Sequence, residues 1–138
     1  MAAETRTATS SVIPFIYYED PRAALDWLQK AFGFEEHVVH TGEDGTIEHA
    51  ELKLGSGMIM PGAPSRYDMK SARELGATNQ GNYVVVDDPD AHYERAKAAG
   101  AEIVEELHDE DYGSRGYTAR DPEGNVWVFG TYDPFGGD

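Results

Sequence analysis

Apolar side chains follow the same pattern of spacing twice along this chain, first every second residue and then every three to four residues. Residues 12–18 form an apolar run of β-branched and aromatic side chains, which is typical of a strand. Residues 24–32 carry apolar side chains at helical spacing, after Asp20-Pro21 and before Gly33. Aspartate caps the free N–H groups of a helix, proline fits its first turn, and glycine is typical of the residue that ends one. The pattern predicts a strand followed by a helix.

Three further strands are expected after this helix, at residues 34–40, 46–54 and 58–60, with glycine-containing turns between them. A connector over residues 61–80 follows, in which Pro and Gly interrupt the apolar pattern. This connector is long enough to form a rim or lid over a neighbouring site.

The same order then begins again. A strand is expected at 82–86, and a helix follows between Asp88-Pro89 and Gly100, the same residue types that bound the first helix. The last three strands are expected at residues 102–107, 116–120 and 125–132. Because both the order and the bounding residues repeat, the sequence predicts an internal duplication.

The length of 138 residues fits one domain, which we expect over residues 12–132. Within it, module one covers 12–60 and module two covers 81–132. Residues 1–11 are expected to be a flexible N-terminus and residues 133–138 a C-terminal tail.

Composition narrows the class of protein. The chain has no cysteine, so disulfides and thiolate metal sites are excluded, and a reducing cytoplasmic location is expected. The start of the chain lacks the apolar region of a signal peptide, and no apolar run is long enough to span a membrane. With 11 basic and 26 acidic residues, the formal net charge is −15. This charge repels nucleic acid and attracts cationic ligands, although most of the acidic residues are expected on the solvated surface.

One predicted strand carries candidate chemistry. In residues 46–54, His49 and Glu51 share the face opposite Ala50 and Leu52. This pair is either a polar exposed or cavity-lining hydrogen-bond pair, or a metal half-site or acid–base pair.

The remaining histidines are not expected to form a metal site or a catalytic site. His37 and His40 are three residues apart, a spacing that places them on opposite faces of a regular strand. His92, in the second helix, and His108, beside an acidic loop, are expected on the surface. Arg115 and Arg120 flank a predicted strand, where either could fix an anionic ligand or pair with one of the many carboxylates.

Several longer motifs together resemble a known superfamily. They are Tyr17-Tyr18-Glu19-Asp20-Pro21, Phe32-Gly33-Phe34, Tyr112-Gly113-Ser114-Arg115 and Asp121-Pro122-Glu123-Gly124-Asn125-Val126-Trp127. On these motifs, residues 12–132 resemble the vicinal oxygen chelate superfamily, which includes glyoxalase I, extradiol dioxygenases, fosfomycin-resistance enzymes and bleomycin-resistance proteins. The nearest resemblance is to small glyoxalase/bleomycin-resistance-like proteins.

The resemblance implies an α+β fold with two tandem βαβββ modules that form a curled mixed sheet around a cavity, and it implies a homodimer. Enzymes of this superfamily bind a divalent metal at up to four strand positions. Those positions fall near Ile13, Met60, Asn82 and Val128 in this chain. Three of these side chains are apolar and Asn is a poor ligand for such metals, so we expect no metal and no other cofactor.

The candidate cavity combines apolar, aromatic and polar side chains, which give adaptable and polarisable walls. Its residues are Ile13, Phe15, Tyr17, His49, Glu51, Met58, Met60, Asn82, Tyr112, Arg115, Tyr117 and Val128. The first hypothesis is a small-molecule-binding protein that sequesters an aromatic or cationic compound, such as an antibiotic, without metal. The alternative is a metal-dependent lyase, isomerase or dioxygenase with a displaced divalent ion, for which His49 and Glu51 are the catalytic candidates. A third hypothesis is an interaction module whose cavity is closed by side chains. No nucleic-acid or membrane partner is expected.

Overall fold

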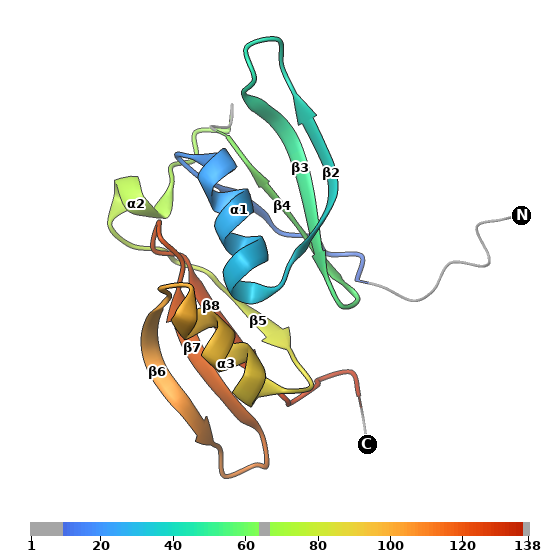
Figure 1. Cartoon of the computed structure of the whole chain (residues 1–138), viewed down its shortest axis with the longest axis vertical. Helices are drawn as coiled ribbons and strands as arrows, with labels where there is room; N and C mark the ends of the chain where they lie inside the picture. Colours follow the sequence, from blue (N-terminus) through green and yellow to red (C-terminus); the bar gives the residue numbers. More distant parts are fainter. Residues whose placement is uncertain (1–9, 64–66, 137–138) are drawn as a thin grey trace, which may run out of the picture.

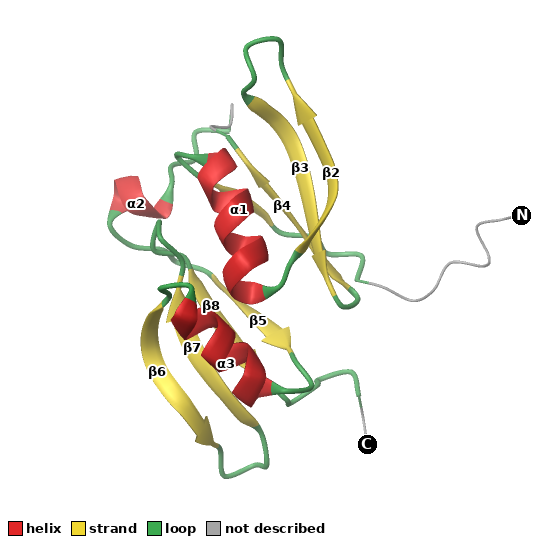
Figure 2. Ribbon diagram, in the orientation of Figure 1, coloured by secondary structure: helices red, strands yellow, loops and turns green. Residues whose placement is uncertain are grey.

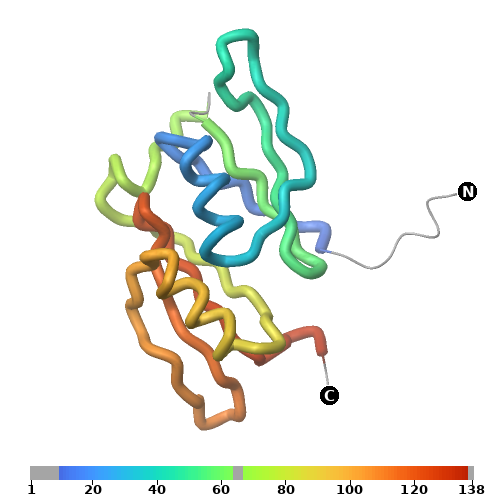
Figure 3. The backbone as a smooth tube through the Cα atoms, in the orientation of Figure 1, coloured from blue at the N-terminus to red at the C-terminus, as the bar shows by residue number. Residues whose placement is uncertain are grey.

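The computed structural model describes residues 10–63 and 67–136, and the expected flexible N-terminus lies mostly outside them (Figure 3). The elements of module one are β1 (Phe15–Tyr17), α1 (Pro21–Phe32), β2 (Glu35–Thr41), β3 (Ile47–Leu54) and β4 (Gly57–Gly62). The connector contains α2 (Ala72–Leu75). The elements of module two are β5 (Gly81–Val85), α3 (Pro89–Ala98), β6 (Glu102–Asp109), β7 (Arg115–Arg120) and β8 (Val126–Gly130). The expected order of strand, helix and three strands therefore occurs twice.

The two modules have the same sheet topology. Their strand orders are β1-β4-β3-β2 and β5-β8-β7-β6. In the first sheet β1 pairs in parallel with β4, and in the second β5 pairs in parallel with β8. The remaining pairs are antiparallel. Figures 1 and 2 show the two sheets as separate units, with α1 and α3 beside each other. The predicted α+β fold of two βαβββ modules is confirmed, and the strands form no closed barrel.

The two helices begin in nearly identical ways. The Asp20 side chain accepts a hydrogen bond from the Ala23 N–H, and the Asp88 side chain accepts one from the Ala91 N–H, each at 3.1 Å. The backbone angles of the two aspartates also agree, with φ −124° and −125°. Each cap uses the same local geometry, as expected for duplicated units.

Strand β4 runs two residues further than the sequence pattern indicated, through Pro61 to Gly62. Pro61 cannot donate a backbone hydrogen bond, which usually ends a strand. Here β3 pairs with β4 only as far as Ile59, so no N–H is needed on that side. On the other side, the Tyr18 N–H donates to the Gly62 carbonyl at 2.9 Å and continues the pairing with β1.

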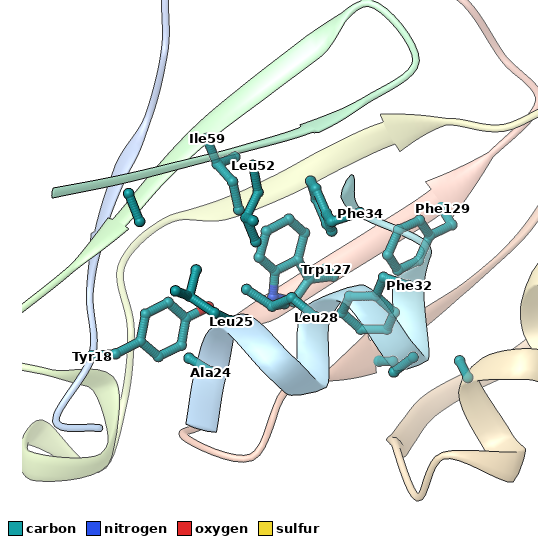
Figure 4. Packing of buried hydrophobic residues seen from close by; sticks show 14 of the residues in the cluster. Tyr18, Ala24, Leu25, Leu28, Phe32, Phe34, Leu52, Ile59, Trp127 and Phe129 are labelled. Carbon is teal, nitrogen blue, oxygen red and sulfur yellow. The ribbon is translucent and has the colours of Figure 1, made fainter. Parts of the chain in front are cut away.

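One hydrophobic core joins the modules. Leu28 and Phe32 of α1 are buried together with Trp127 and Phe129 of β8, and the ring centroids of Phe32 and Phe129 lie 4.7 Å apart (Figure 4). Helix α1 therefore covers part of the second module as well as its own sheet. None of the helices in the described ranges is long and apolar enough to cross a membrane.

The expectation that His92 lies on the surface is wrong. Its Nε2 lies 2.8 Å from the Phe32 carbonyl oxygen, and its Nδ1 lies 2.6 Å from the Tyr117 hydroxyl. The ring also packs on Phe129, with 4.3 Å between centroids. His92 thus connects α3 to the end of α1, whose last carbonyl groups also accept hydrogen bonds from Arg95. His108, in contrast, is exposed as expected and lies 2.8 Å from Glu110.

A buried carboxylate forms the second connection between the modules. Asp121 accepts the Tyr18 hydroxyl at 2.6 Å and the Trp127 indole N–H at 3.1 Å. It also accepts hydrogen bonds from the backbone N–H groups of Glu123 and Asn125. Glu123 in turn accepts the backbone N–H groups of Glu19 and Asp20 at the start of α1. The turn before β8 is thereby fixed to the turn after β1.

Removing this carboxylate is expected to destabilise the whole domain. In Asp121→Ala, the buried donors of Tyr18 and Trp127 lose their acceptor, which costs about 3 kcal/mol in the free energy of unfolding. Urea unfolding measures the loss. The exposed Asp111 provides the control, since Asp111→Ala should change stability by less than about 0.5 kcal/mol. Equal stability of the two variants would contradict a connecting role for Asp121.

His92 is expected to make folding less favourable in acid. Burial lowers the pKa of His92, so between its folded and unfolded pKa values the unfolded chain binds more protons. Its contribution is complete above the unfolded pKa, about 6.5, and is lost as pH falls towards the folded pKa. The difference in unfolding free energy between the parent protein and His92→Phe should therefore shrink from pH 8 to pH 5.

His108→Asn is the matched control for this pH series. The Glu106 carbonyl and the Glu110 side chain raise the pKa of His108, so its contribution is present in acid and is lost as pH rises. If the stability differences of His92→Phe and His108→Asn from the parent protein changed with pH in the same direction, the assigned pKa shift of His92 would be contradicted.

Candidate functional site

The sheet of module one has one face packed under α1 and one face without a covering helix, here called the open face. Ala50, Leu52 and Ile59 point to the helix side and are buried. Neighbouring residues in a strand point to opposite sides, so their strand neighbours point to the open face. The open face carries Phe15, Tyr17, Val38, His40, His49, Glu51, Lys53, Met58, Met60 and Gly62. Six of these are residues predicted for the cavity: Phe15, Tyr17, His49, Glu51, Met58 and Met60. Ile13, also predicted for the cavity, precedes β1.

The strand register arranges these side chains in rows. Phe15 pairs with Met60, and Glu51 pairs with Val38. Glu51 and Met60 each lie one residue beyond the Leu52–Ile59 pair, which makes them neighbours across β3 and β4. A carboxylate therefore adjoins an apolar strip of thioether and aromatic side chains.

A cluster of histidines surrounds this carboxylate. The Nε2 of His49 lies 2.8 Å from Oε2 of Glu51, and the Nε2 of His37 lies 3.9 Å from Oε1. The ring of His40 lies 6.1 Å from that of His49, centroid to centroid. We name Glu51, His37, His40 and His49 the histidine cluster.

The placement of His37 corrects the sequence analysis, which put it on the opposite face from His40. The register shifts between Glu36 and Val38, so both His37 and Val38 lie opposite Glu51. Such a bulge adds one residue and disturbs the alternation of side chains. No residue type in this stretch marks a bulge, and a regular strand was the only basis for the earlier placement.

An open groove lies along the free edge of β1, with a volume of about 840 Å³. Phe15 and Tyr17 line it from module one, and Met69, Leu75 and the polar segment 77–80 line it from the connector. Asn82 and Asn125 complete it from module two. We call it the edge groove. The connector therefore forms one wall of a site, as its length suggested. Within one chain, the space beside the predicted cavity residues is an open groove and an open sheet face.

The other predicted site residues lie apart from the open face of module one. Tyr117 is buried in the core beside His92. Arg115 forms ion pairs with Asp90 at 2.9 Å and Asp109 at 3.2 Å. Tyr112 is exposed in the loop between β6 and β7 and packs against Tyr132.

Asn82 and Val128 lie on different faces of the second sheet. Asn82 pairs with the buried Trp127, whereas Val128 pairs with Tyr83, which is exposed on the face without a helix. The four positions aligned with the superfamily's metal ligands are therefore not brought together. Ile13 and Val128 have no donor atoms, and Met60 offers only a thioether. These residues do not fit a divalent metal of that superfamily.

The histidine cluster was also compared with the geometry of a metal site. Across residues 10–63 and 67–136, no group of three or more His, Asp or Glu side chains is arranged to hold a metal ion. Tyr17, at the border of the open face and the edge groove, remains a hydrogen-bond donor. Partial burial, together with Glu74 and Glu19, raises the pKa of its hydroxyl.

Comparison with known proteins shows which family this chain belongs to. The profile of the Glyoxalase/Bleomycin resistance protein/Dioxygenase superfamily matches residues 10–129. The chain belongs to this superfamily. A structural match is TioX from Micromonospora sp. ML1, with 37% identity, a TM-score of 0.73, and coverage of 88% of this chain and 97% of TioX. An uncharacterized protein of Mycobacterium bovis is 33% identical over 121 residues, covering 85% of this chain and 80% of its own length.

Two solved structures of lower sequence identity share the fold. UcmS2 has 19% identity and a TM-score of 0.71, with coverage of 92% of this chain and 99% of UcmS2. The fosfomycin resistance protein FosX from Listeria monocytogenes, solved with Mn(II), has 14% identity and a TM-score of 0.64, with coverage of 93% and 94%. These structures thus share the fold of this chain.

Proposed function

We propose that this protein binds a small aromatic or cationic molecule, such as an antibiotic, across the open face of module one and the edge groove. The observation that carries the proposal is the continuous strip formed by Phe15, Tyr17 and Met60 beside a groove of about 840 Å³. Half of the Phe15 side chain, 51%, is exposed. Aromatic and thioether groups stack on flat ligands with little dependence on their detailed shape.

The groove also has polar groups to orient a ligand. Asn79, Gln80 and Asn82 line its wall opposite the aromatic residues. Amide groups both donate and accept hydrogen bonds, which suits a heteroaromatic or peptide-like edge. The net charge of −15 adds a long-range preference for cations.

Binding without a metal is part of this proposal. It is supported by the side chains at the four superfamily positions, which lack a suitable donor set or face apart. The alternative is a lyase, isomerase or dioxygenase with a divalent ion held by His49 and Glu51, and their 2.8 Å contact is what favours it. The open groove favours the small-molecule-binding hypothesis over the interaction-module hypothesis, in which side chains would close the cavity.

We also propose that the binding unit is a homodimer. The free faces expose large apolar side chains, including Phe15, Tyr83, Val85 and Val104. β1 and β5 are edge strands, and each offers an unpaired edge to another chain. An apolar surface of this kind on a monomer is typical of an interface, and a second copy could turn the open face into a closed site.

Ligand binding is expected to depend on the aromatic strip. A thermal-shift screen with flat aromatic and cationic drugs should raise the melting temperature, and the shift should persist in EDTA if no metal is needed. Phe15→Ala should weaken binding of the best compound about tenfold because a stacking surface is lost. Phe135→Ala, in the exposed tail, is the control. If no compound stabilises the protein, the proposal fails. A stoichiometric metal that is lost on His49→Ala would favour the enzyme instead.

The homodimer is expected to dissociate when a charge enters its apolar surface. Val85→Asp places a carboxylate on the free face of module two, where its burial between chains is unfavourable. Light scattering after size-exclusion chromatography should show a dimer for the parent protein and a monomer for this variant. Phe135→Asp adds the same charge outside that face and should remain dimeric. A monomeric parent protein would refute the dimer.

A further inference from the structure

We propose that Asn125 and Asn82, here called the amide pair, select neutral aromatic ligands that carry an amide or lactam edge in the edge groove. Such an edge presents an N–H donor beside a carbonyl acceptor. The proposal rests on the binding function above and names the chemical class that the groove selects. It concerns the edge groove alone and does not involve Glu51 or the histidine cluster.

The first observation is that the side-chain amide of Asn125 has a fixed orientation. Its Nδ2 lies 3.2 Å from Oδ2 and 3.3 Å from Oδ1 of Asp121. A carboxylate only accepts hydrogen bonds, so the NH₂ group is the side of the amide that faces Asp121. The backbone N–H of Asn125 donates to the same carboxylate at 3.0 Å and holds the residue in place. The amide oxygen of Asn125 therefore points away from Asp121.

The second observation is that this amide oxygen has no partner within the protein. Across residues 10–63 and 67–136, no donor forms a hydrogen bond with Oδ1 of Asn125. Asn125 is only 9% exposed, yet no sealed side-chain oxygen or nitrogen in these ranges lacks a partner, so Oδ1 belongs to the small exposed part. Asn125 lines the edge groove. A nearly buried acceptor is thus directed into the groove, where a ligand that leaves it without a donor binds unfavourably.

The third observation is a second free amide in the same groove. Asn82 of β5 is half-buried and lines the groove. Its side chain forms no hydrogen bond with any residue that the structure describes. An asparagine side chain has an NH₂ donor and a carbonyl acceptor. Because Asp121 occupies the NH₂ group of Asn125, Asn82 supplies the side-chain donor of the amide pair, and Asn125 supplies an acceptor.

These groups select a ligand by its pattern of donors and acceptors. The N–H of a lactam or secondary amide donates to Oδ1 of Asn125, and its carbonyl accepts from the NH₂ group of Asn82. An ester oxygen in place of the N–H faces the lone pairs of Oδ1 and leaves that oxygen unsatisfied. A site that hydrogen-bonds a particular N–H or O–H rejects an analogue without it more strongly than an apolar pocket rejects the loss of a methylene group.

The groove also accommodates the aromatic part of such a ligand. Phe15 and Tyr17 line it from β1, and its volume of about 840 Å³ lies within the usual range of ligand pockets. In the described ranges, the charged residues that line it are Asp68 and Lys70, which have opposite charges. The groove itself therefore has no excess charge, and hydrogen bonding rather than ion pairing distinguishes its ligands.

The test compares two neutral probes of the same shape. 2-Quinolone is a flat lactam, and coumarin has an oxygen atom in place of the N–H and keeps the carbonyl group. Isothermal titration calorimetry of the parent protein should show about tenfold tighter binding of 2-quinolone, since coumarin loses a hydrogen bond and leaves an acceptor unsatisfied. Equal affinities, or no binding of 2-quinolone, would overturn the proposal.

Two variants separate the roles of the amide pair. Asn125→Ala removes the acceptor, so the ratio of the two affinities should fall to about one. Asn82→Leu keeps the size of the side chain but removes the donor to the carbonyl group that both probes share. It should weaken both probes about fivefold and leave their ratio unchanged. Gln29→Leu removes an amide from α1, outside the groove, and should change neither affinity.

The stability of Asn125→Ala is measured separately because Asp121 loses hydrogen bonds in this variant. Its melting temperature should fall, and the titrations are made well below it. The ratio of two affinities does not depend on how much of the protein is folded. A tenfold preference for 2-quinolone that persists in Asn125→Ala would overturn the role of its amide oxygen. If the variant does not fold, the parent ratio and the effect of Asn82→Leu against Gln29→Leu decide the question.

The outcome for the amide pair is distinguishable from that for the proposed function. If the two probes bind equally but a compound from the drug screen stabilises the parent protein and binds more weakly to Phe15→Ala, the amide pair is overturned and the binding function remains. If neither the probes nor any screened compound binds, both are overturned.

Discussion

The buried carboxylate of Asp121 fixes how the two modules sit against each other. It accepts hydrogen bonds from five donors, the Tyr18 hydroxyl, the Trp127 indole, the Asn125 side chain and the backbone N–H groups of Glu123 and Asn125. A buried charge is tolerated only when its hydrogen-bonding capacity is filled, so these donors must all be in place at once. Since they come from both modules, the junction is as specific as the interior of either module.

This junction determines which faces of the two sheets remain uncovered. It holds the start of α1 against the turn before β8, and α1 then covers Trp127 and Phe129 as well as its own sheet. The faces of both sheets that pack against helices are buried in one shared core. The opposite faces stay uncovered within one chain, and these are the faces that carry Phe15, Glu51 and the exposed side chains of module two. Packing on one side thus leaves the other side of each sheet uncovered.

Local signals made the fold predictable, whereas the site depends on long-range contacts. Asp20 and Asp88 cap their helices through the nearest backbone groups, so the sequence alone identifies both helix starts. His92 is half-buried, and Phe32, sixty residues earlier, supplies the carbonyl acceptor for its ring. His37 reached Glu51 through a bulge that changes the parity of β2. The residues next to His92 and His37 do not predict either the distant partner or the bulge.

The alternation of side chains along a strand predicted the faces of the site residues better in module one than in module two. In module one, residues alternate regularly from His49 to Leu54 of β3, and the predicted residues Phe15, Tyr17, His49, Glu51, Met58 and Met60 share a face. In module two, Asn82 was assigned by alignment to a metal position, but its parallel partner is Trp127, which points into the core. A shift of one residue exchanges the two faces of a strand, so Tyr83 stands where the alignment placed Asn82. The duplicated frame therefore carries different chemistry on its two free faces. Module one presents a carboxylate beside imidazoles, and module two presents the exposed apolar side chains of Tyr83 and Val85.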